Sequence, residues 1–309
     1  MLHGLKPYIA LPFTAILKQI AKQRVKKHPV VQLDLKSISI SDDVYKLEVN
    51  KFDPGLSTQL HAFRFREPAN VYALSKFIRN NDFDLVADVG SNIGYFPFIE
   101  HASKAKKIVA IEPVPETYQV LVNNTRRYEN IVTHNVAVGS ESGTVTMYVP
   151  NYRNLATLLE IANLRNQEIQ HKFRLEKTLE VKVEPLEKFV AGYNSVLVRM
   201  DVEGYEKEIT KTLPEEVCAL SFELHAFILG SEGTYALIKN LWQQNFKIET
   251  AITGIGRSFA SITKIFGIKK ALKLYSLFHA PFILRYPTKS TVKKLITRMQ
   301  HVFLIRKPN

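Results

Sequence analysis

The chain has 309 residues, of which 46% are hydrophobic, so it can bury one large core with additions or two small cores. Its single cysteine, Cys218, excludes an intramolecular disulfide, and we expect no disulfide partner. No run of 18 apolar residues is present, which argues against a membrane-spanning helix. The apolar segment 8–17 is interrupted by Pro12 and lacks a small-residue cleavage site, so we expect a cytoplasmic protein rather than a secreted one.

The net charge of +13 is concentrated at the two ends of the chain. Residues 1–33 contain six Lys or Arg and no acidic residue, and residues 250–309 contain twelve and again none. When these are taken from the total of 42, the segment 34–249 keeps 24 basic residues against 29 acidic ones. This asymmetry favours an anionic partner, either RNA or a membrane surface with acidic headgroups, the latter placing the protein peripherally at the inner membrane surface. A solvated basic tail is the alternative.

The first predicted element in chain order is a basic amphipathic helix over 13–28, where apolar residues recur at helical spacing among lysines. Short alternating runs over 30–66 predict a small antiparallel β addition, and 70–79 predicts a helix that leads into the first core strand. We therefore predict a basic N-terminal unit, residues 1–80, and a main domain, residues 81–309.

The main domain alternates apolar strands with helices. Strands are predicted at 85–89, 108–111, 131–138 (with 144–149 as its extension), 195–201, 219–225, 246–252 and 301–306, and helices at 115–127, 204–213 and 232–244. The polar segment 151–178 is predicted to be a loop and a helix over one face. The alternation predicts an α/β fold with a mainly parallel seven-stranded sheet covered by helices on both faces.

A long basic insert, 254–299, precedes the last strand. Its apolar residues recur every three to four positions with lysines between them, which predicts two basic amphipathic helices. If the sixth strand is parallel to the core and the seventh antiparallel, both ends of the insert lie at the carboxyl edge of the sheet, and the insert should rim the active site. Such periodicity reflects core packing more often than membrane contact.

The most informative motif follows the first core strand. Asp88 ends an apolar run, Gly90, Ser91, Asn92 and Gly94 form a turn, and the next strand closes on Glu112. Glycines let the main chain approach a ligand, the following helix start offers free N–H groups, and an acid about 20 residues on can bind a ribose diol. The layout predicts a nucleoside site, the alternative being an ordinary βαβ turn of a flavodoxin-like domain.

The glycine spacing bears on which nucleoside binds. A dinucleotide site usually has Gly-x-Gly-x-x-Gly, whereas Ser91 and Asn92 occupy that part of this turn. Asp88, at the entrance to this turn, suits a cation better than a pyrophosphate, since its negative charge would repel the phosphates. The positively charged S-adenosylmethionine is therefore the predicted cofactor.

Together these residues make the chain resemble the FkbM-like family of S-adenosylmethionine-dependent methyltransferases, from about residue 67 to 227 and again at 301–307. The matching blocks, in order, are DVGSNIGY (88–95), IEP (111–113), NVAVG (135–139), DVEG (201–204) and FELH (222–225). The chain departs from the family at Leu186-Glu187, where Leu-Asp is usual, and at Ala156-Thr157-Leu158, where a Ser-Leu or Thr-Ser-Leu element is usual. Both departures concern loops on the acceptor side.

The resemblance implies a Rossmann-like class I methyltransferase sheet and assigns cofactor roles. Asp88, Gly90 and Gly94, with Ser91 and Asn92 between them, would shape the pocket for the methionine part. Glu112 would accept hydrogen bonds from the ribose hydroxyls. Asn135, Val136 and Ala137 would lie near the adenine.

Methyl transfer to a hydroxyl needs alignment of donor and acceptor and the removal of one proton. Four candidate catalytic residues stand at predicted strand ends: Asp201, Glu203, Glu223 and His225. His225 is the predicted base because of its titration range, and Asp201 could orient the acceptor. No metal is predicted, although the same carboxylates and histidine could instead hold Mg²⁺. A dipole-favoured helix acid at Glu203 and a purely structural histidine at 225 are the alternatives.

The predicted function is O-methylation of a sugar or related hydroxyl on a glycan, glycolipid or small metabolite. An RNA methyltransferase is an alternative, in which the terminal lysines track phosphates. The Asn-Pro-Pro-Tyr element expected where an exocyclic base nitrogen is methylated is absent. A noncatalytic binding protein that retains the fold is the third hypothesis.

Overall fold

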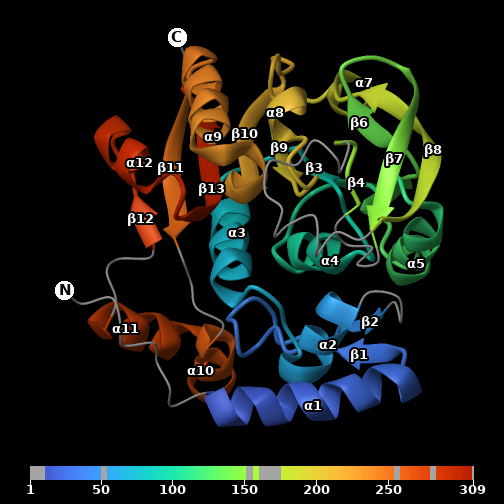
Figure 1. Ribbon diagram of the computed structural model, residues 1–309, viewed down its shortest axis with the longest axis vertical. Helices are drawn as coiled ribbons and strands as arrows, with labels where there is room; N and C mark the ends of the chain where they lie inside the picture. Colours follow the sequence, from blue (N-terminus) through green and yellow to red (C-terminus); the bar gives the residue numbers. More distant parts are fainter. Residues whose placement is uncertain are drawn as a thin grey trace.

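The computed structural model describes residues 11–49, 54–150, 156–159, 175–253, 258–278 and 283–307. Its centre is an eight-stranded sheet with the order β12-β11-β13-β10-β9-β3-β4-β5 (Figure 1). The strands are β3 (Leu85–Val89), β4 (Ile108–Ile111), β5 (Ile131–His134), β9 (Val196–Met200), β10 (Val217–Glu223), β11 (Phe246–Thr253), β12 (Ile283–Arg285) and β13 (Met299–Arg306).

Strand direction follows the pattern expected from the sequence. The five strands β5, β4, β3, β9 and β10 are parallel, and β13 runs antiparallel between β10 and β11. All residues of β3 and of β9 are buried, as continuous apolar runs predict for parallel strands covered on both faces. The Rossmann-like class I methyltransferase sheet is therefore confirmed, with β12 as an additional edge strand paired to β11.

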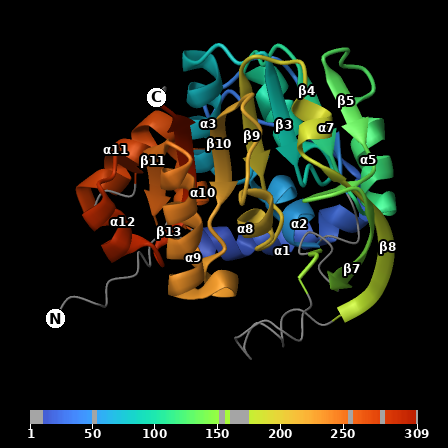
Figure 2. The same ribbon diagram turned by 90° about the horizontal axis from the view of Figure 1, so that it is seen from above.

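Helices cover both faces of the sheet because successive strand residues point to opposite sides. Val86 packs in one cluster with α3 (Pro68–Asn80), α4 (Tyr95–Ala102) and α5 (Pro115–Thr125). Leu85 and Ala87 pack in the other, with α7 (Glu187–Val190), α8 (Glu206–Ile209), α9 (Ala226–Gln243) and α12 (Lys289–Leu295). Figure 1 shows α7, α8 and α9 above the strands and α3, α4 and α5 below them, and Figure 2, seen from above, shows the strands side by side.

The N-terminal addition contains more helix than the sequence indicates. The predicted first helix is α1 (Leu11–Lys27), and β1 (Val30–Gln32) pairs antiparallel with β2 (Lys46–Glu48) as predicted. A further helix, α2 (Pro54–Phe63), follows and packs against α1. Buried residues of α2 belong to the same cluster as α3 and α4, so the core of the addition is continuous with one face of the main sheet. The division at residue 80 stays a prediction.

The prediction of 131–138 as one strand, extended by 144–149, is wrong. After β5 the chain leaves the main sheet and builds a second, three-stranded sheet with the order β6-β8-β7 (Figure 1). Its strands are β6 (Ala137–Gly139), β7 (Gly143–Pro150) and β8 (Leu175–Pro185). The segment predicted to be irregular ends in β8. Its long antiparallel pairing with β7 provides hydrogen-bond partners for the backbone of β7, which has none in the main sheet. Residues 151–155 and 160–174 of that segment lie outside the described residues.

The insert forms α10 (Ser258–Phe266), α11 (Ile268–Phe278), β12 and α12, rather than two helices alone. Phe259, Ile268 and Ala271 are buried in the core cluster, and α10 contacts α1 and α2. Part of the insert's apolar periodicity therefore reflects packing against the N-terminal addition. Among the described residues, no helix combines the length and the hydropathy needed to cross a bilayer.

Candidate functional site

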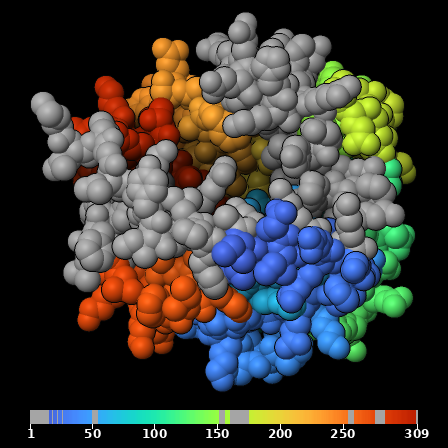
Figure 3. All heavy atoms as spheres, turned by 60° about the horizontal axis from the view of Figure 1, so that its bottom comes forward, coloured from blue at the N-terminus to red at the C-terminus, as the bar shows by residue number. Residues whose placement is uncertain are grey.

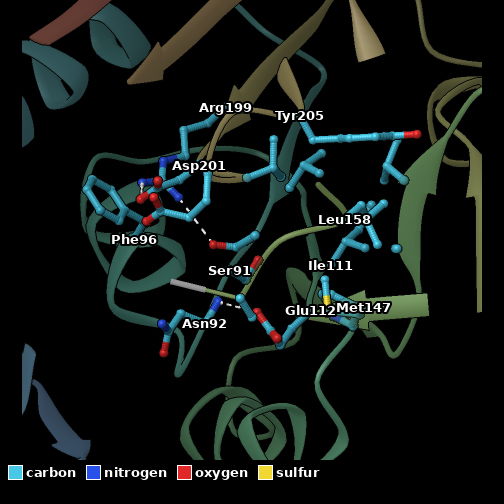
Figure 4. A pocket seen from close by; sticks show the side chains of 18 of the residues that line it. Ser91, Asn92, Phe96, Ile111, Glu112, Met147, Leu158, Arg199, Asp201 and Tyr205 are labelled. Carbon is cyan, nitrogen blue, oxygen red and sulfur yellow. Dashed lines mark hydrogen bonds and ion pairs between the residues drawn. The ribbon is translucent and has the colours of Figure 1, made fainter. Parts of the chain in front are cut away.

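A pocket lies where β3, β4 and β9 end, at the point where the chain order of the sheet reverses (Figure 4). Doubly wound sheets bind ligands at this place because the loops after neighbouring strands diverge and leave a crevice. The turn after β3, the end of β4 and the segment after β9 contribute Gly90, Ser91, Asn92, Glu112, Asp201 and Glu203 to its lining.

The turn after β3 requires glycine at position 90. Gly90 has φ +85°, and a Cβ there would lie 2.2 Å from the carbonyl oxygen of Asp201. Gly94 has φ +90° and precedes the first residue of α4. The Ser91 hydroxyl donates to the carbonyl of Asp88 at 2.8 Å and closes the turn. The main chain of this turn therefore forms one wall of the pocket.

Glu112 faces the pocket from the end of β4. Its carboxylate accepts hydrogen bonds from the backbone N–H of Asn92 at 3.0 Å and of Val114 at 2.9 Å, and only 6% of the residue is exposed. Burial raises the pKa of Glu112 to about 7, while the two amide donors act in the opposite direction. Each carboxylate oxygen accepts one of these bonds and keeps a second lone pair, which suits a vicinal diol.

The nine predicted cofactor residues divide into two groups. Six of them line the pocket: Gly90, Ser91, Asn92, Glu112, Val136 and Ala137. The other three lie outside the lining and support it. Asp88 is fully buried, Gly94 starts α4, and the Asn135 side chain donates to the carbonyls of Glu112 and Pro113 at 2.8 and 3.0 Å. Their direct contact with a cofactor stays a prediction.

Arg199 is a central residue that the sequence prediction missed. Its guanidinium donates to Asp88 and to Asp201, each at 3.0 Å, and lies 3.6 Å from the centre of the Phe96 ring. Arg199 is 1% exposed and lines the pocket. Burial acts to lower its pKa, but the neighbouring carboxylates outweigh this and raise it. The one sequence feature that could have pointed to Arg199 is that it is the single charged residue in the otherwise apolar strand β9.

Glu100 of α4 is fully buried next to this ion-pair network, and neither of its carboxylate oxygens has a hydrogen-bond partner. Burial raises the pKa of Glu100 well above its usual value, and the charge of Asp88 adds to the effect. The folded protein therefore holds Glu100 in its protonated form.

Replacing Glu100 by glutamine should stabilise the protein increasingly as the pH rises. The unfolded carboxyl ionises above about pH 4 while the folded one stays protonated, so the parent protein loses stability with rising pH through this range. Glutamine has no such equilibrium. We expect the difference in unfolding temperature, measured calorimetrically, to grow in favour of Glu100→Gln by about 2–4 °C or more between mildly acidic and mildly basic pH. A difference independent of pH would contradict an uncharged Glu100.

The four predicted catalytic residues meet at one end of the pocket. Asp201 and Glu203 line it, and His225 and Glu223 lie beside them. The His225 Nδ1 lies 2.9 Å from Oε1 of Glu206, and its Nε2 lies 3.2 Å from Oε2 of Glu203 and 3.8 Å from Oδ1 of Asp201. Sequence reasoning missed Glu206, whose place opposite His225 depends on the turn after β9.

The charge of His225 follows from these contacts. The residue is 1% exposed, and burial alone would lower its pKa, but the carboxylates of Glu206 and Glu203 outweigh burial and hold the pKa well above its usual value. Both ring nitrogens face carboxylates, so the imidazole acts as a buried cation that holds the acidic residues together.

Glu223 has a different environment. Burial raises its pKa to about 8, with Asp201 adding to the rise and His225 opposing it. One ligand atom from each of Asp201, Glu223 and His225 lies within 4.8 Å of the others, so this group could hold a cation. Because His225 already faces Glu203, a metal ligand role would require that contact to break. The Mg²⁺ alternative stays a hypothesis.

Other walls of the pocket are formed by the N-terminal addition and by the second sheet, not by the loops at the edge of the main sheet. Leu56 of α2 and Arg66 come from the N-terminal addition, and Met147 and Leu158 come from the second sheet and the segment next to it. The hydroxyl of Thr157 donates to the carbonyl of Glu203 at 3.1 Å and so fixes this segment beside the acidic cluster. No described residue of the insert 254–299 is among the lining residues, so for this pocket the N-terminal addition takes the place expected for the insert.

The strand order and the pocket together define a class I, Rossmann-like methyltransferase fold. The model of the FkbM methyltransferase domain matches residues 88–248, which is more than half of the chain. The chain therefore belongs to the FkbM methyltransferase family, as its motifs predicted.

Two curated proteins are distantly similar. "Methyltransferase 1" of Beauveria bassiana is 23% identical over 175 residues, which cover 52% of this chain and 70% of that protein. The hexuronic acid methyltransferase AglP of Haloferax volcanii is 25% identical over 181 residues, which cover 56% of this chain and 67% of that protein. Among solved structures, TrmK of M. capricolum in complex with S-adenosylhomocysteine superimposes with a TM-score of 0.36 at 10% identity, covering 76% of this chain and 68% of that one.

Proposed function

We propose that this protein is an S-adenosylmethionine-dependent methyltransferase. The observation that carries the proposal is Glu112, held by the amides of Asn92 and Val114 at the pocket wall beside the glycine turn. Its free lone pairs would accept hydrogen bonds from the ribose diol. Three carboxylates, Glu112, Asp201 and Glu203, line the pocket against two guanidinium groups, and this excess of acid favours a cationic ligand such as the sulfonium and its amino group.

The proposed acceptor is a hydroxyl of a sugar or of a related small molecule. At the end of the pocket proposed for the acceptor, Asp201 and Glu203 line the wall and Glu223 lies next to Asp201, and these carboxylates can accept hydrogen bonds from several hydroxyl groups. A curated relative is a hexuronic acid methyltransferase, which supports a sugar acceptor for this chain. The in-line displacement needs no covalent intermediate, so the protein aligns the acceptor oxygen with the methyl group and removes the hydroxyl proton.

We assign the removal of this proton to Glu223 rather than to His225. Each ring nitrogen of His225 faces a carboxylate, and these two contacts hold the ring in its protonated form, which cannot act as a base. Glu223 has a pKa of about 8 and can take up a proton near neutral pH. A base is most effective when its pKa lies near the working pH. Asp201, held by Arg199 and adjacent to both groups, would orient the acceptor.

Replacing Glu223 by glutamine should lower kcat by about 10²- to 10⁴-fold and leave the Kd for S-adenosylmethionine unchanged. In the parent enzyme kcat should rise with pH and level off above about pH 8, since only the ionised carboxylate accepts the proton. The variant should lose this rise. Steady-state kinetics across pH would test this, with the exposed Glu232→Gln as a matched control. An unaltered pH profile in Glu223→Gln would exclude Glu223 as the base.

The function as a whole is tested by two measurements on the full chain. Calorimetric titration should show binding of S-adenosylmethionine, and transfer of its labelled methyl group should occur to saccharide or glycolipid acceptors. Absence of heat at millimolar cofactor would overturn the methyltransferase proposal. Binding without transfer to either saccharides or RNA would favour a noncatalytic binding protein, and transfer to RNA alone would favour an RNA methyltransferase.

A further inference from the structure

We propose that one face of the protein, built by α1, α10 and α11, docks on a membrane surface rich in anionic phospholipids. We call it the basic face. Its exposed residues are Ile16, Ile20, Arg24 and Lys27 of α1 and Ile265, Phe266, Lys269, Lys270, Lys273 and Leu274 of α10 and α11. The proposal goes beyond methyl transfer and does not depend on it.

Exposed residues of α1 follow one stripe of the helix. Ile16, Ile20, Arg24 and Lys27 recur every three to four positions, which places them on the same side of an α-helix. Ile16 is 58% exposed and Ile20 is 44% exposed, whereas Ala21 is buried. The helix therefore packs one side on α2 and presents two large aliphatic residues followed by two cations on the other side.

The two helices of the insert show the same division. Ile268 and Ala271 are buried, while Ile265 and Phe266, at the end of α10, are 58% and 51% exposed. The lysines 269, 270 and 273 and Leu274 are exposed on α11. The core packing found for this segment thus accounts for its buried residues and leaves a second, exposed set of apolar and basic side chains.

The helices of the basic face lie at the same end of the molecule although they are far apart in the chain. Figure 1 shows α1, α10 and α11 together below the main sheet, and α10 contacts α1. Figure 3, with this end turned forward, shows the blue N-terminal segment beside the orange insert on one surface. Exposed cations from two distant parts of the chain, Arg24 and Lys27 of α1 and the three lysines of α11, therefore lie at the same end of the protein.

The mixture of side chains favours lipid over nucleic acid as the partner. An interfacial segment binds by placing apolar side chains at the acyl boundary while lysines meet acidic headgroups, and each lysine adds to the attraction. The five exposed apolar residues supply the first part and the exposed lysines the second. A single-stranded nucleic acid would instead use several exposed aromatic rings for base stacking, and among the described side chains of α1, α10 and α11 Phe266 is the one exposed aromatic ring.

Docking would also bring the pocket close to the lipid. α1 packs on α2, and Leu56 of α2 lines the pocket, so the addition that carries the α1 part of the basic face also forms one pocket wall. An acceptor joined to a lipid would then be held near the site by the surface itself.

The test is co-sedimentation of the full chain with vesicles of phosphatidylcholine alone or mixed with phosphatidylglycerol. We expect binding to the mixed vesicles only, decreasing with salt. The variant Lys269→Glu/Lys270→Glu/Lys273→Glu should bind at least about 100-fold more weakly. A control variant, Lys182→Glu/Lys239→Glu/Lys247→Glu, makes the same charge change at exposed lysines of β8, α9 and β11 and should bind like the parent.

A second variant, Ile265→Ser/Phe266→Ser, separates docking from simple charge attraction. It keeps every lysine and should still lose about tenfold or more in vesicle binding, since two apolar side chains no longer enter the interface. Circular dichroism melting of each variant would confirm that it folds. Equal loss in the two lysine variants, full binding by Ile265→Ser/Phe266→Ser, or retention of RNA without vesicle binding would each overturn the proposal.

Discussion

Replacing Glu112 by glutamine should weaken the binding of S-adenosylmethionine by about 100-fold or more, because charge-assisted hydrogen bonds contribute roughly 1.5–3 kcal/mol each. Glutamine keeps the shape of the side chain but loses the charge. Its NH₂ group would also face one of the amide donors of Asn92 and Val114, so the turn itself would have to rearrange. Titration calorimetry measures the effect directly, and the exposed Glu129→Gln is the matched control.

The pH dependence of cofactor binding gives an independent check on Glu112. Its pKa of about 7 without ligand means that a large fraction of the carboxyl is protonated in mildly acidic solution. A bound cation and a donating diol both favour the ionised form, so affinity should rise as the pH increases through about 7 and then level off. In Glu112→Gln this rise should vanish. An unchanged Kd and an unchanged pH dependence would together remove Glu112 from the cofactor site.

The second large effect is expected from Arg199→Met. Methionine fills a similar space but leaves Asp88 buried with no positive partner and releases Asp201 from the pocket wall. Breaking a buried ion pair on one side costs about 3–5 kcal/mol, so the unfolding temperature should fall by roughly 10 °C. Differential scanning calorimetry measures this shift. The exposed Arg298→Met removes the same charge from the surface and should have little effect.

A double variant separates the electrostatic cause from loss of packing against Phe96. Adding Asp88→Asn to Arg199→Met removes the uncompensated buried charge, so the double variant should be more stable than Arg199→Met alone. If the double variant is no more stable, the cost of Arg199→Met comes from the lost contact with the Phe96 ring instead. A wild-type unfolding temperature in Arg199→Met would contradict the central role of the ion-pair network.

Local patterns in the sequence were enough to predict the main sheet. Strands such as β3 and β9 are short continuous apolar runs, and the positions of Gly90 and Glu112 are set by the turn and by the next strand along the chain. These features depend on residues close in sequence, so their place at one sheet edge followed from the alternation of strands and helices alone.

The second sheet was beyond the reach of the same reasoning. β7 pairs with β8 across a long intervening segment, and strand pairing of this kind leaves no local signal that distinguishes it from an extension of the main sheet. The same limit applies to α2, whose place against the pocket depends on packing with α1 and α3 rather than on its own pattern.

The charges of the site show which features follow from the sequence and which depend on the tertiary structure. The sequence by itself determined the class I sheet, the glycine turn with its facing acid, and the concentration of basic residues at both ends, because each is a property of composition or of neighbouring residues. The tertiary structure alone decided that His225 lies between Glu203 and Glu206, that Arg199 joins Asp88 to Asp201, and that α1 meets the helix α10 of the insert. Protonation depends on burial and on charges brought together from distant segments. A local sequence pattern does not show which of these distant residues lie close together in the fold.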